Sequence, residues 1–296
     1  MATSAVNSPE DPETTSAPAK FRHIYHADAT LFDINLEKPV LHSEKHAQIG
    51  LRGPHQKYDH QAMGPYQLRG LISYGSGYTH VAAHETEKAY TTLTTGAVEN
   101  LNVLDVLTAD RIVGQIYTEY LKRKDCEDPN ESDPVPVVTF IGTRFENLRI
   151  CGQEIDLDWD IEVVGGKLKD GSYVNAEKLL GNPSTNKVVN MPEHQSAADG
   201  PKPRPEARAV GSLVKVKKDP AVGIRETEYC IFIPQFGRIY LGELEICRVP
   251  SKDKKDHDAY HVKLNMVRLA MGCIAAGKGT AVALDTNGGG KGSGGG

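Results

Sequence analysis

The chain of 296 residues lacks most of the short motifs that identify enzymes. Its five cysteines are spaced too widely for CxxC zinc or redox sites, so we expect reduced and mostly buried thiols. It has no GxSxG nucleophile elbow and no complete GxxxxGKS/T phosphate-binding loop. No segment approaches the run of about 18 apolar residues that a membrane-spanning helix needs. No catalytic class is indicated, and we expect neither a cofactor nor a membrane span.

Aromatic residues and positive charge are also scarce. Aromatic residues make up 6% of the chain and include one tryptophan, Trp159. Few side chains are therefore available to stack on sugars, and glycan binding is only a weak alternative. The formal net charge is −5, and the one lysine-rich run, residues 252–255, contains an aspartate. We therefore expect no binding of nucleic acid.

Both ends of the chain have the composition of flexible segments. Residues 1–20 are rich in Ser, Thr, Pro and Glu, which predicts disorder. Residues 286–296 predict a flexible, Gly-rich tail. Because the first residues lack the basic and then apolar pattern of a secretory signal, we expect a cytoplasmic location.

The intervening residues have the pattern of a mainly β protein. Short β-branched and aromatic runs separated by glycine fill residues 67–285, which predicts a single antiparallel β-sandwich or barrel-like core. Residues 21–66 contain few apolar groups and predict an irregular arm, with one strand near residues 29–36. Residues 165–210 interrupt the strand rhythm, which predicts an insertion with a short helix that ends at Gly181.

The longest apolar-rich run is Val98–Leu121. Residues 112–121 within it fit an amphipathic helix, and they also fit a strand with apolar groups on both faces. Because Val, Ile, Thr and Tyr dominate, we favour a strand that is buried on both sides. The sequence AAGKGTA matches only part of a phosphate loop, so Gly277 and Gly279 predict a hairpin turn.

Two segments show the strict alternation of half-buried strands. In residues 155–163, apolar side chains that include Trp159 alternate with acidic ones. We expect Trp159 to face the core and the acids to form a solvated, edge-protecting face, or a contact surface for a protein or glycan. Carboxylates about 6.5 to 7 Å apart on a strand do not suit calcium. In residues 260–266 the alternation changes phase at Val267, which predicts a bulge or a bend.

Eight of the 11 histidines lie between His23 and His84. His80 and His84 have the spacing of a helical metal site but lack the Glu of HExxH. On a strand these two residues stand about 13 Å apart, too far to share one ion. Solvated or packing roles are therefore the main interpretation. A metal site would need His80 or His84 to meet a partner from another strand, such as His60 or Asp59.

The order of these segments resembles that of the choice-of-anchor P family. Residues 98–110, VENLNVLDVLTAD, are similar to a VEG-x-N-L-L-x-x-L-V-T-A-D run in that family, and residues 145–152, FENLRICG, to its F-x-N-L-R-V-x-G segment. The resemblance covers roughly residues 67–285, although Gln235 replaces the first glycine of the family's Pro-Gly-x-Gly turn. It implies a β-rich, surface-associated module without established catalytic residues.

Two residues of the shared motifs predict structural roles. Asp110 is expected to cap a turn and Arg149 to form an ion pair with it, which would join neighbouring strands. The sequence thus favours a non-enzymatic structural or binding module that binds a protein partner or self-associates. The alternative is a metal-binding protein or a metal-dependent enzyme that uses His60, His80 and His84.

Overall fold

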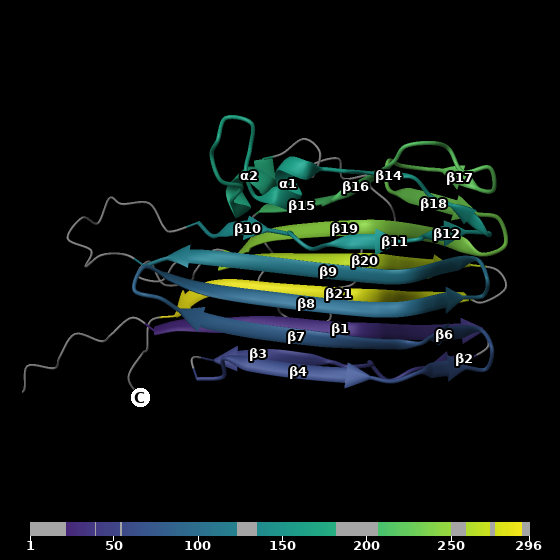
Figure 1. Cartoon of the computed structure of the whole chain (residues 1–296), viewed down its shortest axis with the longest axis horizontal. Coiled ribbons are helices and arrows are strands. Elements are labelled where there is room, and N and C mark those ends of the chain that lie inside the picture. Colours follow the sequence, from purple (N-terminus) through teal and green to yellow (C-terminus); the bar gives the residue numbers. More distant parts are fainter. Residues whose placement is uncertain are drawn as a thin grey trace, which may run out of the picture.

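The computed structural model describes residues 22–38, 40–53, 55–122, 135–181, 207–249, 259–272 and 276–291. Two antiparallel sheets pack face to face, and their strands run along the long axis of the molecule in two layers, one behind the other (Figure 1). The prediction of a mainly β sandwich is therefore confirmed. Among the described residues, no helix has the length and apolar character needed to cross a bilayer. The predicted disorder of residues 1–20 lies outside the described part.

The first sheet, called sheet A here, is built around four long neighbouring strands. Its strands, in spatial order, are β17 (Ile224–Arg225), β18 (Cys230–Ile233), β19 (Gly237–Val249), β20 (Ala259–Met271), β21 (Ala276–Lys291), β1 (Arg22–Lys38) and β2 (Val40–His42), with β15 (Ala207–Ser212) beside β19 and β3 (Ile49–Gly53) beside β1.

The second sheet, sheet B, is centred on the hairpin of β8 and β9. Its strands are β13 (Gln153–Glu154), β12 (Arg149–Ile150), β9 (Leu107–Leu121), β8 (Ala89–Val103), β6 (Ile72–Tyr74) and β5 (Tyr66–Leu68), with β10 (Val137–Thr139) and β11 (Arg144–Glu146) beside β9, β7 (Ser76–Glu85) beside β8, and β4 (Tyr58–Met63) beside β7.

A small third unit covers one edge of the sandwich (Figure 1). It contains β14 (Leu157–Trp159) paired with β16 (Val214–Val216), and the helices α1 (Ile161–Gly165) and α2 (Ala176–Gly181). The short helix predicted to end at Gly181 is confirmed. The rest of the predicted insertion, residues 182–206, lies outside the described residues.

Glycines on the inner face of sheet B let the two sheets approach closely. A Cβ atom on Gly114 would lie 2.9 Å from Met266 Cγ and 2.9 Å from Val282 Cγ1 of sheet A. A Cβ on Gly96 would lie 3.0 Å from the same Val282 atom. The apolar side chains of sheet A fill this space and remove a continuous apolar interior from water.

The prediction of an irregular arm over residues 21–66 is wrong for most of its described residues, although the one strand expected near residues 29–36 is confirmed as part of β1. β1 is one of the longest strands and lies between β21 and the pair β2 and β3, inside sheet A. Its inward positions include Ala27 and Ala29, which are completely buried. Alanine is a weak signal for a strand in the sequence, but its small side chain fits where two sheets pack tightly.

Two further details of the expected strands are corrected. Residues 112–121 do form a strand, but its outer face is only half-buried at Gln115, Tyr117 and Glu119. Gly277 and Gly279 lie within β21 and not in a turn. A Cβ on Gly277 would be 2.3 Å from the Asn35 carbonyl oxygen, so glycine is needed there for the close approach of β1. β21 also continues to Lys291, within the expected flexible tail.

Candidate functional site

In the central strands of sheet A, the alternation of inward and outward side chains changes phase about halfway along the strand. Leu31 and Phe32 of β1 are consecutive and both buried, as are Met266 and Val267 of β20. Leu31 reaches Gly77 of sheet B and Phe32 lies 6.1 Å from the Tyr74 ring, so both point into the sandwich. The bulge or bend predicted at Val267 is thus confirmed.

The same change occurs in the two neighbouring strands. Ala281 and Val282 of β21 are both buried, and Val282 has a φ of 54°, which is unusual for a β-branched residue. Gly242 of β19 has a φ of 58°. These residues form one row across the four strands, and the regular backbone pairing skips it. In β20, for example, Asn265 and Val267 are paired with both neighbouring strands, but Met266 between them is not. In β1, β20 and β21 two successive side chains therefore turn inward, and in β19 the same row is occupied by Gly242.

The outer face of sheet A is left without side chains along this row. The gap forms a cavity of about 400 Å³, which we call the trough. Ala283 lines it with only a methyl group, which keeps it open. The residues that line the trough are Asp28, Thr30, Asp33, Lys45, Gln48, Arg52, Lys263, Asn265, Thr280, Ala283, Leu284 and Asp285.

Two oxygen atoms in the trough wall are buried and have no hydrogen-bond partner. They are Oδ1 of Asn265, a side chain that is 4% exposed, and Oδ1 of Asp285. The amide of Asn265 donates a long hydrogen bond of 3.4 Å to Glu243 Oε1, which fixes the direction of its oxygen. An unpaired buried acceptor costs about 1 to 3 kcal/mol. These atoms mark the trough as a place where a partner is missing.

Two of the three aspartates that line the trough, Asp28 and Asp285, have opposite electrostatic surroundings. Asp28 accepts a hydrogen bond of 2.7 Å from Arg52 and lies 3.1 Å from His26 Nε2. These groups hold the pKa of the Asp28 carboxyl below its usual value, although partial burial opposes them. Asp285 lies directly opposite Asp28 on β21. Burial, and then the Asp28 charge, raise the pKa of Asp285 against the effects of His261, Lys263 and His26.

An ion pair lies beside the trough, where Glu243 of β19 is paired opposite Asn265. Arg268 donates from Nε and Nη2 to the two oxygens of Glu243, at 2.8 Å each, and both side chains are largely buried. The guanidinium also lies 3.6 Å from the centre of the Tyr240 ring. This bidentate pair holds Glu243, and with it the neighbouring Asn265, in a fixed position.

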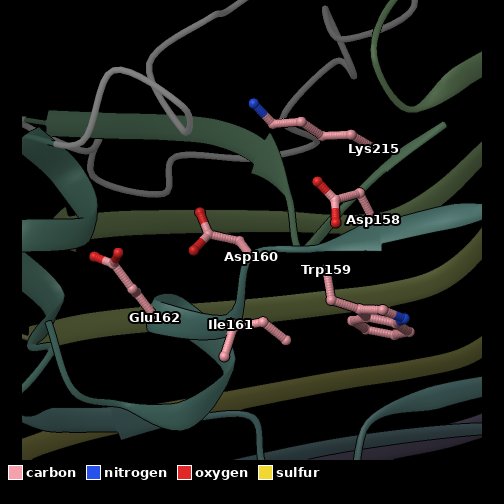
Figure 2. A pocket seen from close by; sticks show the side chains of 6 residues that line it. All are labelled: Asp158, Trp159, Asp160, Ile161, Glu162 and Lys215. Carbon is pink, nitrogen blue, oxygen red and sulfur yellow. The ribbon is translucent and has the colours of Figure 1, made fainter. Parts of the chain in front are cut away.

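A second cavity, of about 270 Å³, lies beside β14 and α1 (Figure 2). Asp158, Asp160 and Glu162 lie on the same side as Lys215, and Trp159 extends to the opposite side. Asp160 accepts a hydrogen bond of 3.2 Å from the Val163 amide and caps α1, while Glu162 lies 3.1 Å from Lys169. No buried polar atom among its described lining residues lacks a partner, so this cavity is the weaker candidate.

The strand predicted over residues 155–163 is therefore only partly correct. β14 stops at Trp159, because the Asp160 side chain caps a helix, and Ile161 is 72% exposed. Trp159 does pack against the core as expected, with its ring 5.9 Å from that of Phe145. Local capping chemistry prevailed over the alternating pattern.

The structure brings together two of the three predicted metal ligands. His60 of β4 lies directly opposite His80 of β7, with 6.3 Å between the ring centres. His84 is exposed and lies farther along β7, opposite Thr91. Burial, with the nearby His60, lowers the pKa of His80. Within the described ranges, no group of three or more His, Cys, Asp or Glu side chains could hold a metal ion.

The predicted structural pair of Asp110 and Arg149 is not formed. Asp110 Oδ2 instead accepts a hydrogen bond from the Asn147 amide, and no ion pair or hydrogen bond joins Asp110 to Arg149 in the described structure. Arg149 is exposed and its backbone pairs with Thr108. The two shared motifs are thus joined across β9 and β12, as expected, but through a different side chain.

Sequence reasoning missed the residues of the trough. The alternation of residues 260–266 puts Asn265 on the polar face of a half-buried strand, Asp28 lies in the segment predicted to be an irregular arm, and Asp285 is the last residue of the predicted core. The change of phase at Val267 was the available signal. It could not be interpreted as a site, because a trough forms only when several strands make the same change side by side.

A family model described as "Domain of unknown function (DUF8256)" matches residues 23–247. The match runs from β1 to β19 and so includes Asp28 of the trough and the neighbouring Glu243, but not β20 or β21. The comparisons with curated proteins and with solved structures gave no match.

Proposed function

The chain belongs to the DUF8256 family of domains of unknown function, and we propose that it is a non-enzymatic binding module that takes a small polar ligand in the trough. The observation that carries this proposal is the pair of buried oxygens of Asn265 and Asp285 without a partner. A ligand that donates hydrogen bonds to them would remove the cost of leaving them unpaired. The volume of about 400 Å³ suits a small molecule.

The chemistry of the lining favours binding over catalysis. The described lining residues include no Ser, Cys or His that could serve as an activated nucleophile or general base in contact with a ligand. Asp28 is already engaged by Arg52 and His26. The remaining amide, hydroxyl, carboxylate and amino groups can fix the orientation of a ligand without transferring a group to it.

Thermal unfolding of the full chain tests this proposal. The wild type and the Asn265→Leu variant would be heated with a panel of amino acids, sugars, nucleotides and polyols at millimolar concentration. We expect at least one compound to raise the Tm of the wild type by several degrees and to leave the variant unchanged. A control variant, Thr91→Val on the outer face of sheet B, should respond like the wild type. Absence of any shift, or equal shifts in Asn265→Leu, would contradict the proposal.

A second candidate function is binding of a transition metal by His60 and His80. The observation in its favour is their position opposite each other on β4 and β7, where two imidazoles can approach one ion. Full-length protein incubated with one equivalent of copper(II) sulfate and then desalted should retain copper, and His80→Phe should not. His84→Phe is the matched control and should retain it. Release of all copper by the wild type would exclude this candidate.

A further inference from the structure

We propose that the ligand of the trough is a small zwitterion, with a primary ammonium group held by Asn265 and Asp285 and a carboxylate directed toward the lysines at the rim. This inference rests on the binding function proposed above. It adds the chemical class of the ligand, which follows from the types of atom, the charges and the exposure of the residues around the trough.

The deep part of the trough offers acceptors. Asn265 lies opposite Ala283, and Asp285 is the next outward residue of β21 beyond Ala283. Their side chains therefore project diagonally on either side of a methyl group, and each has an unpaired oxygen. Thr30, opposite Ala283 on β1, adds a hydroxyl. An ammonium group has three donors and no acceptor, so it matches this set of atoms.

The charge in the deep part also favours an ammonium group over a neutral hydroxyl. Asp28 has Arg52 and His26 as partners, whereas Asp285 faces the Asp28 carboxylate and has a buried oxygen without a hydrogen bond. Lys263 is opposite Asp285 on β20 but is exposed at the surface. A hydroxyl would satisfy the hydrogen bond alone. An ammonium group would satisfy it and also supply a counter-charge to Asp285.

The rim of the trough has the opposite character. Lys45, Arg52 and Lys263 line it, and all three are exposed. A ligand with several positive charges would be repelled by them, whereas a carboxylate at the far end would be attracted. No group of three or more His, Cys, Asp or Glu residues in the described chain suits a metal ion, which argues against a bare divalent cation. A ligand with one ammonium group in the deep part and one carboxylate at the rim fits both parts of the trough.

Isothermal titration calorimetry with the full chain tests this assignment. The probes are glycine, 4-aminobutyrate and 6-aminohexanoate, which separate the two charges by increasing lengths. Hexanoate and hexylamine are the matched controls, because each lacks one of the two charges. We expect at least one zwitterion to bind at least tenfold more tightly than both controls. Asp285→Asn should weaken this binding at least tenfold, and Lys263→Met should weaken it less.

Two further measurements separate the possible failures. Glu99→Gln on the outer face of sheet B should bind like the wild type, and the Tm of Asp285→Asn should show that it is folded. If hexylamine or hexanoate binds as tightly as the zwitterions, the assignment is wrong. If no zwitterion binds but a polyol or sugar binds and is lost in Asn265→Leu, the assignment fails while the binding function stands. If nothing binds in either experiment, both proposals fall.

Discussion

The outer faces of the two sheets are both polar, but they use polarity in different ways. On sheet B, Tyr58, His80, His60 and Tyr78 form a continuous series of ring contacts at 5.2 to 6.3 Å near the edge strand β4. Tyr58 and His60 are exposed to water, and Tyr78 and His80 are half-buried. On sheet A, Glu243 and Asn265 are 5% and 4% exposed although they lie on the outer side.

The difference shows that the exposure of a polar group, and not its chemical type, decides how much it changes the free energy of unfolding. A solvated ring or charge keeps its hydrogen bonds to water, so its removal changes little. A buried polar group must find a partner within the protein or remain unpaired at a cost. The change of phase in sheet A produces such burial on the outer face, whereas the regular alternation of β7 leaves its outward side chains partly or fully exposed to water. The following substitutions test this contrast, from the largest expected effect to the smallest.

The largest contrast is between two arginine pairs. Arg268→Ala on sheet A should lower the free energy of unfolding by about 3 to 5 kcal/mol, because Glu243 would remain buried without its partner. Arg144→Ala on sheet B removes the pair with Glu146, in which both side chains are more than 40% exposed, and should cost less than about 1 kcal/mol. Urea unfolding followed by circular dichroism measures both. Equal losses of stability in the two variants would show that the outer faces of sheets A and B do not differ in this way.

The double variant Glu243→Leu with Arg268→Met sharpens this test. Because it removes both charges together and keeps similar volume, it should lose much less stability than Arg268→Ala. A loss as large as that of the single variant would mean that packing on Tyr240, and not the unpaired charge, dominates.

Histidines give the second contrast. His23 is 6% exposed and stacked on Tyr90 at 4.5 Å, and burial lowers its pKa to about 4, with Glu85 acting in the opposite direction. The unfolded chain therefore takes up a proton near pH 6.5 that the folded chain refuses until about pH 4. The free energy of unfolding should therefore fall by roughly 3 kcal/mol as the pH decreases from 6.5 to about 4. Below about pH 4, His23 should cause no further decrease.

The variant His23→Phe keeps the stacked ring but cannot be protonated. Its free energy of unfolding should decrease less than that of the wild type between pH 7 and pH 4, by about the same 3 kcal/mol. The exposed His84 is the control, and His84→Phe should leave the pH dependence unchanged. Parallel pH profiles for His23→Phe and the wild type would contradict the buried, neutral state of His23.

The smallest contrast compares a satisfied with an unsatisfied buried group. Thr79→Val removes the hydrogen bond of 2.7 Å from the Thr79 hydroxyl to the Ala47 carbonyl and should cost about 1 to 2 kcal/mol. Asn265→Leu removes an oxygen that has no partner and only the long, 3.4 Å hydrogen bond from its amide to Glu243, so it should cost less than Thr79→Val or raise stability. Urea unfolding of the ligand-free proteins distinguishes them. A larger loss for Asn265→Leu would show that its oxygen is satisfied in solution.

Several elements could be predicted because their signals are local. The two-residue alternation of residues 260–266 and the β-branched residues of segment 112–121 are properties of the local sequence. Both segments are strands in the structure. The Gly181 end of α2 is equally local. The first part of β1, before the strand predicted near residues 29–36, was missed because Ala27 carries little apolar signal, although its small side chain suits the narrow space opposite sheet B.

By itself the sequence determined the class of fold, since alternation and turn residues specify which face of each strand is buried. It also determined the position of the phase change in β20. Only the tertiary structure decided that Leu31, Val282 and Met266 would align in one row, because pairing between strands distant in the chain sets that register. The trough and its unpaired oxygens follow from this alignment, since a cavity is a property of neighbouring strands and not of any single one.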